Sequence, residues 1–160
     1  LDNAVTWIND PRVTRWMLLG DLPLTQLAED EYFERMMRSG TEEIEFAVET
    51  LEGEHIGFTG IHKIDWRHGV GHSGTVIGRS DCWGQGYGTD AVRVRTRYGF
   101  ETLGLRMVLS EVLADNVGSL KMCANAGMRE VGRIPRRYWK RGEFRDVVLF
   151  VVDRETWLPG

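Results

Sequence analysis

Three glycines alternate with other residues in the segment Gly84-Gln85-Gly86-Tyr87-Gly88, which follows a β-branched run. Glycine takes positive φ values and lets a ligand approach the backbone closely, so successive N–H groups can point at one anion. Residues 89–103 have the apolar spacing of an amphipathic helix, and a helix N-terminus carries partial positive charge. This order of segments favours a cradle for a phosphate-like group over a plain flexible turn.

The same glycines also match a dinucleotide-binding pattern, Gly-x-Gly-x-x-Ala, at Gly86, Gly88 and Ala91. That pattern belongs to a tight strand-to-helix turn in a repeating β-α-β unit, with an acidic residue ending the next strand. In this chain several residues separate the preceding strand-like run from the glycines, and hairpins come before it. The segment therefore favours an anion site outside a dinucleotide fold.

The composition of the 160 residues is that of an ordinary soluble globular protein, with 42% hydrophobic and 28% charged residues. We expect one domain over residues 1–160, because a chain of this length buries a single core. The net charge of −4 argues against a nucleic-acid partner, whose phosphates require a basic surface. No membrane span is expected, and no signal-peptide pattern opens the chain.

Cysteines and histidines are few and lack the spacing of a metal site. Cys82 and Cys123 do not form a disulfide framework, so a reducing cytoplasm is the expected compartment. The histidines have no near cysteine pair; they are His55, His62, His68 and His72. We therefore predict that no metal is bound.

Hydrophobic periodicity and turn residues predict the order of the elements. Helices are expected at 7–17, with a break at Asn9-Asp10-Pro11, and at 25–38. Strands at 45–50, 56–64 and 74–78 should form an antiparallel meander. After the helix at 89–103 come a strand at 107–113, a helix at 118–126, a strand beginning at 128–133 and a hairpin at 138–152. The order predicts an α+β (mixed α/β) fold.

Several groups of residues, in this order along the chain, resemble the core of the GNAT acetyltransferases. They are Trp83-Gly84-Gln85-Gly86-Tyr87-Gly88-Thr89-Asp90-Ala91, Leu103-Gly104-Leu105-Arg106, Val112-Leu113-Ala114-Asp115-Asn116, Ser119 with Ala126-Gly127-Met128, and Asp146-Val147-Val148-Leu149. The nearest resemblance is to the branch of ribosomal-protein N-terminal acetyltransferases, with spermidine and small-molecule relatives. It implies a mostly antiparallel, splayed central sheet flanked by helices. The first strand of that fold has no counterpart here, so we expect it to be absent from the chain as given.

The resemblance implies acetyl-CoA as cosubstrate, with its pyrophosphate bound by backbone N–H groups of Gly84, Gln85, Gly86, Tyr87, Gly88 and Thr89. The strand with Val76, Ile77 and Gly78 would hold the pantetheine arm and stabilise charge on the thioester carbonyl. Asn116 and Ser119 would lie near that arm, although both also suit the start of a helix. Trp83 departs from the family pattern, which has a polar Gln or Arg there.

The acid and base of the reaction are less clearly indicated. An amine acceptor is protonated at neutral pH, so the attack on a thioester requires removal of a proton. The family often has a tyrosine as acid where this chain has Cys123, which is otherwise a small buried hydrophobe. His72 takes the place of a glutamate in related sequences and is a candidate base, or an exposed strand residue. Glu111 and Tyr138 are the alternatives.

The resemblance therefore implies an N-acetyltransferase, an acyltransferase that moves the acetyl group from the CoA thioester to a primary amine. The amine, on a protein N-terminus or a small molecule, would attack directly in a ternary complex. Approximation of the two reactants supplies much of the rate. A non-catalytic acyl-CoA sensor of the same fold and an unrelated phosphate binder are the alternatives. The expected partner is the amine substrate, without nucleic acid or membrane, and a homodimer is the alternative to a monomer.

Overall fold

The computed structural model describes residues 2–18, 20–39 and 42–157 of the chain. Its helices and strands follow one another in the order α1 (Asp2–Ile8), α2 (Pro11–Thr14), α3 (Gln26–Ser39), β1 (Ile44–Glu49), β2 (His55–Asp65), β3 (Val70–Ile77), the short 3-10 turn η1 (Ser80–Cys82), α4 (Tyr87–Glu101), β4 (Met107–Leu113), α5 (Val117–Asn125), β5 (Arg129–Lys140) and β6 (Glu143–Asp153).

Capping residues set the boundaries of the N-terminal helices. The Asp10 carboxylate accepts the N–H of Arg12 at 2.9 Å, and Pro11 fills the first position of α2, where an N–H has no partner anyway. Thr25 Oγ1 accepts the N–H of Ala28 at 3.2 Å and starts α3 in the same way. The helix predicted at 7–17 is therefore divided at the predicted Asn-Asp-Pro break.

The strands form one six-stranded sheet in the order β1-β2-β3-β4-β6-β5. Neighbouring strands are antiparallel except β3 and β4, which are parallel and are connected through α4. A parallel pair requires such a long crossover, whereas short turns join the antiparallel pairs β1–β2, β2–β3 and β5–β6. The predicted meander and the α+β class with a mostly antiparallel sheet are both confirmed.

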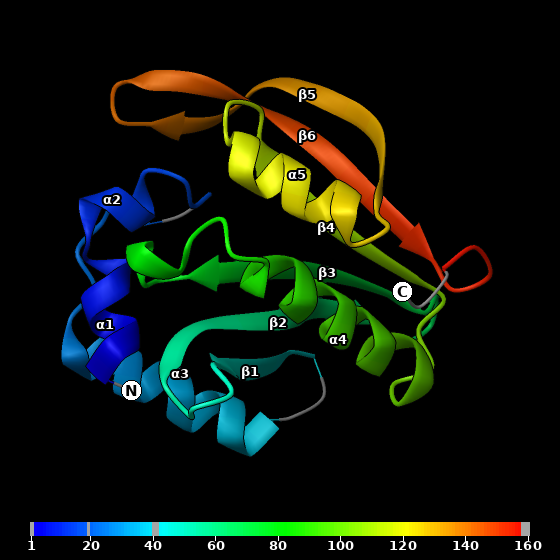
Figure 1. The fold of residues 1–160 in the computed structure, drawn as a ribbon, viewed down its shortest axis with the longest axis horizontal. Helices are drawn as coiled ribbons and strands as arrows, with labels where there is room; N and C mark the ends of the chain where they lie inside the picture. The colour runs from blue at the N-terminus through cyan, green and yellow to red at the C-terminus, as the bar shows by residue number, and fades with distance from the viewer. Residues whose placement is uncertain (1, 19, 40–41, 158–160) are drawn as a thin grey trace.

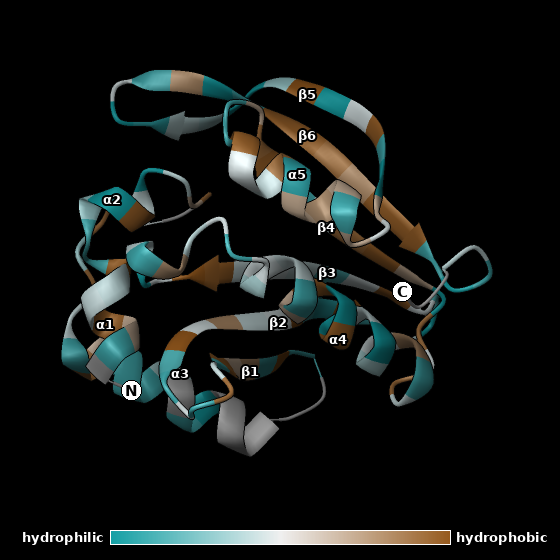
Figure 2. Ribbon diagram, in the orientation of Figure 1, coloured by the Kyte–Doolittle hydropathy of each residue, from teal (hydrophilic) through white to brown (hydrophobic). Residues whose placement is uncertain are grey.

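The core lies between the sheet and the two helices α4 and α5, which cover the same face (Figure 1). Arg93 of α4 donates to the carbonyl of Asn125 on α5 at 2.8 Å and joins the two helices. The buried cluster between the layers comprises Ile61, Ile64, Val92, Phe100, Leu105, Val108, Val112, Cys123, Ala126, Met128, Val148, Phe150 and Val152. Figure 2 shows a continuous hydrophobic stretch along β6, which lies between β4 and β5 in the sheet.

The N-terminal helices lie away from this core. Figure 1 shows α3 beside β1, and α1 and α2 near the end of β3. The tip of the β5–β6 hairpin reaches α2, where Arg141 Nη2 donates to the Pro11 carbonyl at 2.9 Å. No helix among the described residues is long and apolar enough to cross a membrane.

Candidate active site

The sheet opens between β3 and β4. The two strands pair only from Val70, opposite Met107, to Ser73, opposite Ser110. Beyond that point β3 stays paired with β2 as far as Ile77, and β4 stays paired with β6 to its end. The two strands therefore diverge after the serine pair and leave a gap in the sheet.

Backbone groups of β3 face this gap. The Gly78 N–H donates to the Ile56 carbonyl on β2 at 2.8 Å. Because successive residues of a strand alternate in direction, the backbone groups of Ile77 and Thr75 face the opposite side, toward β4. The Ile77 carbonyl accepts the indole N–H of Trp83 at 2.6 Å. Trp83, the residue that departs from the family pattern, thus binds β3 through its side chain.

The glycine segment turns directly into α4. Gly84 has φ +73° and Gly86 has φ +92°, values that favour glycine, and Gly86 is the N-cap of the helix. The helix starts at Tyr87, two residues before the predicted position 89, because this left-handed cap ends the loop. Tyr87, Gly88 and Thr89 are its first residues, and the first N–H groups of a helix have no partner within it. The loop and helix start can therefore bind an anion through the backbone.

Close packing against other side chains explains two further glycines of this region, Gly78 and Gly88. A Cβ at Gly88 would lie 2.6 Å from Met122 Sδ on α5, so glycine lets α4 and α5 meet. A Cβ at Gly78 would overlap the ring of Trp7, which packs on the end of β3. Val76 and Ile77, between these contacts, are partly buried.

Surface polar contacts fix the loop before the glycines. Arg79 donates to Glu54 at 2.9 Å and to Asp81 at 2.5 Å, so its guanidinium is occupied by carboxylates. The side chain of Gln85 donates to the Asp81 carbonyl at 2.5 Å. Gln85 therefore contributes its backbone, and not its amide group, to the cradle.

Asn116 caps α5. Its side-chain oxygen accepts the N–H of Ser119 at 3.2 Å, and its amide group donates to the Trp16 carbonyl at 3.4 Å. These contacts correspond to the capping alternative given above. They also connect the start of α5, beside the end of β4, to the N-terminal segment.

Cys123 lies on the helix side of the sheet, within the core cluster, and is 1% exposed. Burial raises the pKa of its thiol, an effect that Arg95 and a hydrogen bond with Ser110 partly offset. The structure thus places Cys123 as a neutral buried thiol under the point where β3 and β4 part. Its predicted acid role stays a prediction.

The other two predicted catalytic residues face the opposite side. Ser73 and Ser110 point toward the helices, so the alternating residues His72 and Glu111 point away from them. The hydroxyl of Tyr138 donates to Glu111 Oε2 at 3.0 Å. Burial and this hydrogen bond raise the pKa of Tyr138, which keeps its proton. The structure brings Glu111 and Tyr138 together, whereas His72 is exposed on the neighbouring strand.

A bulge in β5 delivers Tyr138 to this position. β5 runs unbroken from Arg129 to Lys140, where the sequence predicted separate pieces, and its register with β6 shifts between Ile134 and Tyr138. The bulged Arg136 has φ +52° and donates its N–H to Asp146 Oδ1 at 2.9 Å. The sequence analysis named Asp146 in a family-like segment but did not predict this contact; Pro135 inside the strand-like run was the available signal for a bulge.

A buried carboxylate on the same face was also missed. Glu45 of β1 is placed with its Oε2 3.8 Å from His62 Nδ1, and its side chain is only 13% exposed. Burial, with help from Glu43, raises the pKa of Glu45 to about 7. Burial likewise lowers the pKa of His62. No sequence signal marked this pair, because Glu45 alternates with apolar residues in the strand Ile44–Glu49 and so takes an outward position in the pattern.

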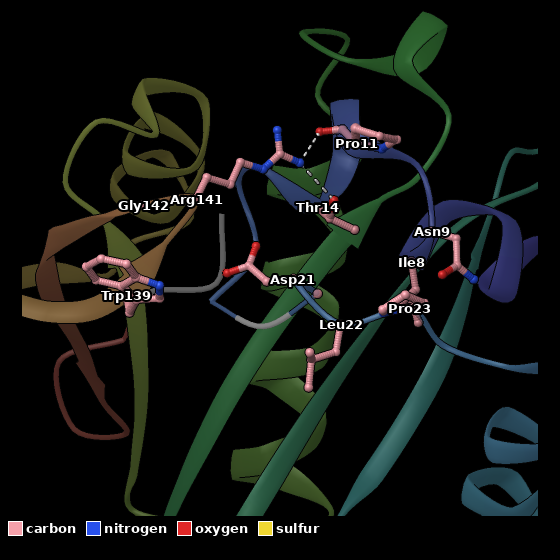
Figure 3. Close-up of a pocket in the computed structure, with 11 residues that line it drawn as sticks. Ile8, Asn9, Pro11, Thr14, Asp21, Leu22, Pro23, Trp139, Arg141 and Gly142 are labelled. Atoms are coloured by element: carbon pink, nitrogen blue, oxygen red, sulfur yellow. Dashed lines mark hydrogen bonds between the residues drawn. The ribbon is translucent and has the colours of Figure 1, made fainter.

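A hollow of about 660 Å³ lies between the N-terminal segment and the β5–β6 hairpin (Figure 3). Its lining combines apolar and charged residues: Ile8, Asn9, Pro11, Thr14, Gly20, Asp21, Leu22, Pro23, Trp139, Arg141 and Gly142. Lys140 Nζ, almost fully buried beside it, donates to Asp21 at 2.8 Å and to the Thr14 carbonyl at 3.1 Å. Within the described residues, no group of His, Cys, Asp or Glu side chains could hold a metal ion.

Comparisons with known proteins agree with this geometry. The family described as "Acetyltransferase (GNAT) domain" matches residues 1–129. The chain is 29% identical over 147 residues to p20 of Bacillus licheniformis, an uncharacterized N-acetyltransferase, which covers 89% of this chain and 80% of that protein. It is 34% identical over 82 residues to an FsC-acetyl coenzyme A-N(2)-transacetylase of Aspergillus fumigatus, over 48% of this chain and 33% of that protein.

A solved structure shares the fold. The spermidine N-acetyltransferase from Vibrio cholerae, in complex with CoA and spermine, superposes with a TM-score of 0.86 at 17% identity, over 95% of this chain and 88% of that one. None of these named relatives is a ribosomal-protein acetyltransferase, so that narrower resemblance stays a prediction. The family match and the shared fold show that this chain belongs to the GNAT acetyltransferases and, as an N-acetyltransferase, is an acyltransferase.

Proposed function

We propose that the protein transfers an acetyl group from acetyl-CoA to the primary amine of a small molecule, by direct attack in a ternary complex. The observation that carries this proposal is the gap between β3 and β4, with a backbone anion cradle at one side and the Glu111–Tyr138 pair at the other. Residues 1–160 act as one domain here, since all the described strands pair into one sheet.

The cradle fits the charge and shape of a CoA pyrophosphate. The N–H groups of residues 84–89 would bind it at the start of α4, where Gly84 and Gly86 need positive φ and Gly88 meets Met122. The gap-facing N–H groups of Thr75 and Ile77 would hold the pantetheine arm and polarise the thioester carbonyl. When bound, the thioester supplies an acyl carbon open to attack and a sulfur that leaves with the electron pair of the broken bond.

Glu111 is the residue we assign as general base. It lies on the strand beside the gap, and Tyr138 orients its carboxylate from across β6. A carboxylate there can bind the acceptor as an ammonium ion and accept its proton as the N–C bond forms, directly or through a water molecule. His72, on the other edge of the gap and on the same face, is the alternative base.

A small-molecule amine is favoured as acceptor over a protein N-terminus. The sheet face opposite α4 and α5, here called the acceptor face, carries Glu111 beside the gap, and a carboxylate there attracts a cationic amine. The Vibrio cholerae protein of the same fold is named for spermidine and was solved with spermine. The Aspergillus fumigatus relative is named as an acetyl coenzyme A transacetylase. These names support an amine acceptor and acetyl-CoA as the donor.

The test is release of CoA thiol from acetyl-CoA with spermidine, free amino acids, aminoglycosides and peptides with free N-termini. We expect turnover with at least one small amine, and a loss of about 100-fold in kcat for Glu111→Gln. His72→Ala should retain most activity. A larger loss of kcat in His72→Ala than in Glu111→Gln would make His72 the base. Turnover restricted to peptides would overturn the small-molecule acceptor.

Cys123 gives one specific reason to keep the sensor alternative. The position at which the family resemblance implies an acid holds a buried thiol. A sensor would bind acetyl-CoA in calorimetry and give no turnover with any amine of the panel. Binding of nucleotides without CoA would instead indicate an unrelated phosphate site.

A further inference from the structure

A buried arginine lies against β2 and β3, where β3 begins to part from β4, and it has no counter-ion among the described residues. Arg95 of α4 is 2% exposed, and its Nη1 donates to Thr75 Oγ1 at 2.9 Å, to the Gly74 carbonyl at 3.1 Å and to Thr59 Oγ1 at 3.2 Å. Its Nε has no hydrogen-bond partner, and no described carboxylate forms an ion pair with it. A native protein rarely keeps such a group without a reason.

Stability does not explain this arginine. A buried charge is costly, and replacing one with an apolar side chain of similar volume is often neutral or stabilising. The groups that Arg95 binds would keep partners without it, because Thr59 Oγ1 also donates to the Gly74 carbonyl at 3.1 Å and lies 2.7 Å from Thr75 Oγ1. The fold therefore does not depend on the guanidinium to satisfy these atoms.

The position of the charge relates it to the gap. Gly74 and Thr75 are the first residues of β3 beyond the last pair with β4. Ile77, whose backbone faces the gap, lies two residues further, which is about 7 Å along a strand. Cys123 of α5, on the same helix side of the sheet, interacts with both Arg95 and Ser110. Arg95, Cys123 and Ser110 are thus neighbours on the helix side, at the point where β3 and β4 part.

The charge is present at neutral pH. Burial lowers the pKa of Arg95 to about 10, and the groups that act in the other direction are Cys123 of α5 and the Glu45 carboxylate of β1. Cys123 is a neutral thiol, and Glu45 points to the other face of the sheet. The titratable groups on that other face beside the gap are His72, Glu111 and Tyr138. The cation on the helix side is therefore not neutralised locally.

We infer that Arg95 is an electrostatic positioning residue: its buried charge stabilises the negative charge that bond cleavage leaves on the CoA sulfur in the gap. This inference rests on the proposed CoA site. Arg95 acts through β3 and does not touch the ligand. In the family resemblance, a tyrosine stabilises the leaving group, and this chain has Cys123 at that position. Arg95 takes over this role from α4. An opposite charge under the site lowers the pKa of a thiol.

The test measures the pKa of the thiol of bound CoA by ultraviolet titration of its thiolate, in the parent chain, Arg95→Met and Arg95→Lys. The complex with desulfo-CoA serves as the blank, which removes the signals of Cys82 and Cys123. We expect Arg95→Met to raise the thiol pKa by about one unit, and Arg95→Lys to keep it near the parent value. The urea midpoint of Arg95→Met should be equal to or above that of the parent.

Arg93→Met is the matched control, since Arg93 lies two residues away on α4, is partly exposed and donates to Asn125. It should leave the thiol pKa unchanged. In turnover, Arg95→Met should lower kcat about tenfold with KM for acetyl-CoA within about twofold, corresponding to a one-unit pKa change. An unchanged thiol pKa in Arg95→Met, with CoA bound as tightly as before, would overturn the inference. Failure of the parent chain to bind CoA would instead overturn the proposed function.

Discussion

The two faces of the sheet at the gap between β3 and β4 use different kinds of chemical group. On the helix side, the proposed CoA contacts are main-chain groups, with Gly84 and Gly86 in positive φ and the start of α4 next to them. On the opposite face, the proposed catalytic groups are side chains from separate elements, Glu111 of β4 and Tyr138 of β5. A site made of backbone keeps its ligand while its side chains vary. A site made of side chains can change its acceptor without altering the cofactor cradle.

Gly86→Val should break the helix side most severely. A β-branched residue is strained at φ +92°, so the loop must change shape and the first N–H groups of α4 must turn. We expect roughly 100-fold weaker CoA binding in calorimetry, about 2.7 kcal/mol. Gly104→Val is the control, because Gly104 also has positive φ and open space but lies after α4. Equal losses of affinity in both variants would contradict a specific cradle.

Tyr138→Phe tests whether the acceptor face works as a unit. Removing the hydroxyl takes away the hydrogen bond to Glu111 but leaves the ring and the bulge in place. We expect kcat to fall about tenfold with CoA affinity unchanged, because orienting a base contributes less than the base itself. Steady-state kinetics with the best amine, beside Glu111→Gln, provides the measurement. A Tyr138→Phe variant that loses CoA binding would contradict the separation of the two sides.

Glu45→Gln tests the buried carboxylate of the acceptor face as a pH-dependent element. A carboxyl whose pKa is raised from 4.5 to about 7 favours the folded state fully below pH 4.5, and this contribution is lost as the pH rises to about 7. The difference corresponds to about 3 kcal/mol. Urea unfolding should therefore show Glu45→Gln to be more stable than the parent at pH 8, by about 2 kcal/mol, and similar to it near pH 4.5. A parent stability independent of pH over this interval would refute the assignment.

Asn116→Ala should have the smallest effect of these variants. It tests whether the Asn116 side chain only caps α5 or also contacts the cofactor. Loss of the cap on α5 should lower the free energy of unfolding by about 1 kcal/mol. We expect the Kd for CoA to stay within about twofold. Thr25→Ala, which removes the corresponding cap of α3, is the matched control for stability. A tenfold loss of CoA affinity in Asn116→Ala alone would show that the side chain also contacts the cofactor.

The backbone side could be predicted from the sequence because its signals are local. Glycines at 84, 86 and 88 before an amphipathic stretch specify a loop and a helix start through φ values and spacing. The antiparallel meander of β1, β2 and β3 was predicted in the same way from short turns and alternating patterns. The left-handed cap at Gly86 shifted the start of α4 by only two residues from the prediction.

The side-chain face could not be predicted in the same way, because it depends on contacts between distant segments. Glu111 reaches Tyr138 only because β6 separates β4 from β5 and the bulge at Arg136 is held by Asp146. Arg95 and Glu45 occur in the sequence as ordinary charged residues of a helix and a strand. Their burial follows from packing against β2 and β3, which no local pattern records.

The bulge in β5 also affects how the sheet meets other chains. β5 is an edge strand, and Pro135 has no N–H to offer, while the adjacent Arg136 gives its own to Asp146. The straight row of donors and acceptors that another strand would need is therefore interrupted, and nearby arginines place like charges along it. This edge of the sheet is thus protected against intermolecular strand addition, and hence against aggregation, by the same distortion that brings Tyr138 to Glu111.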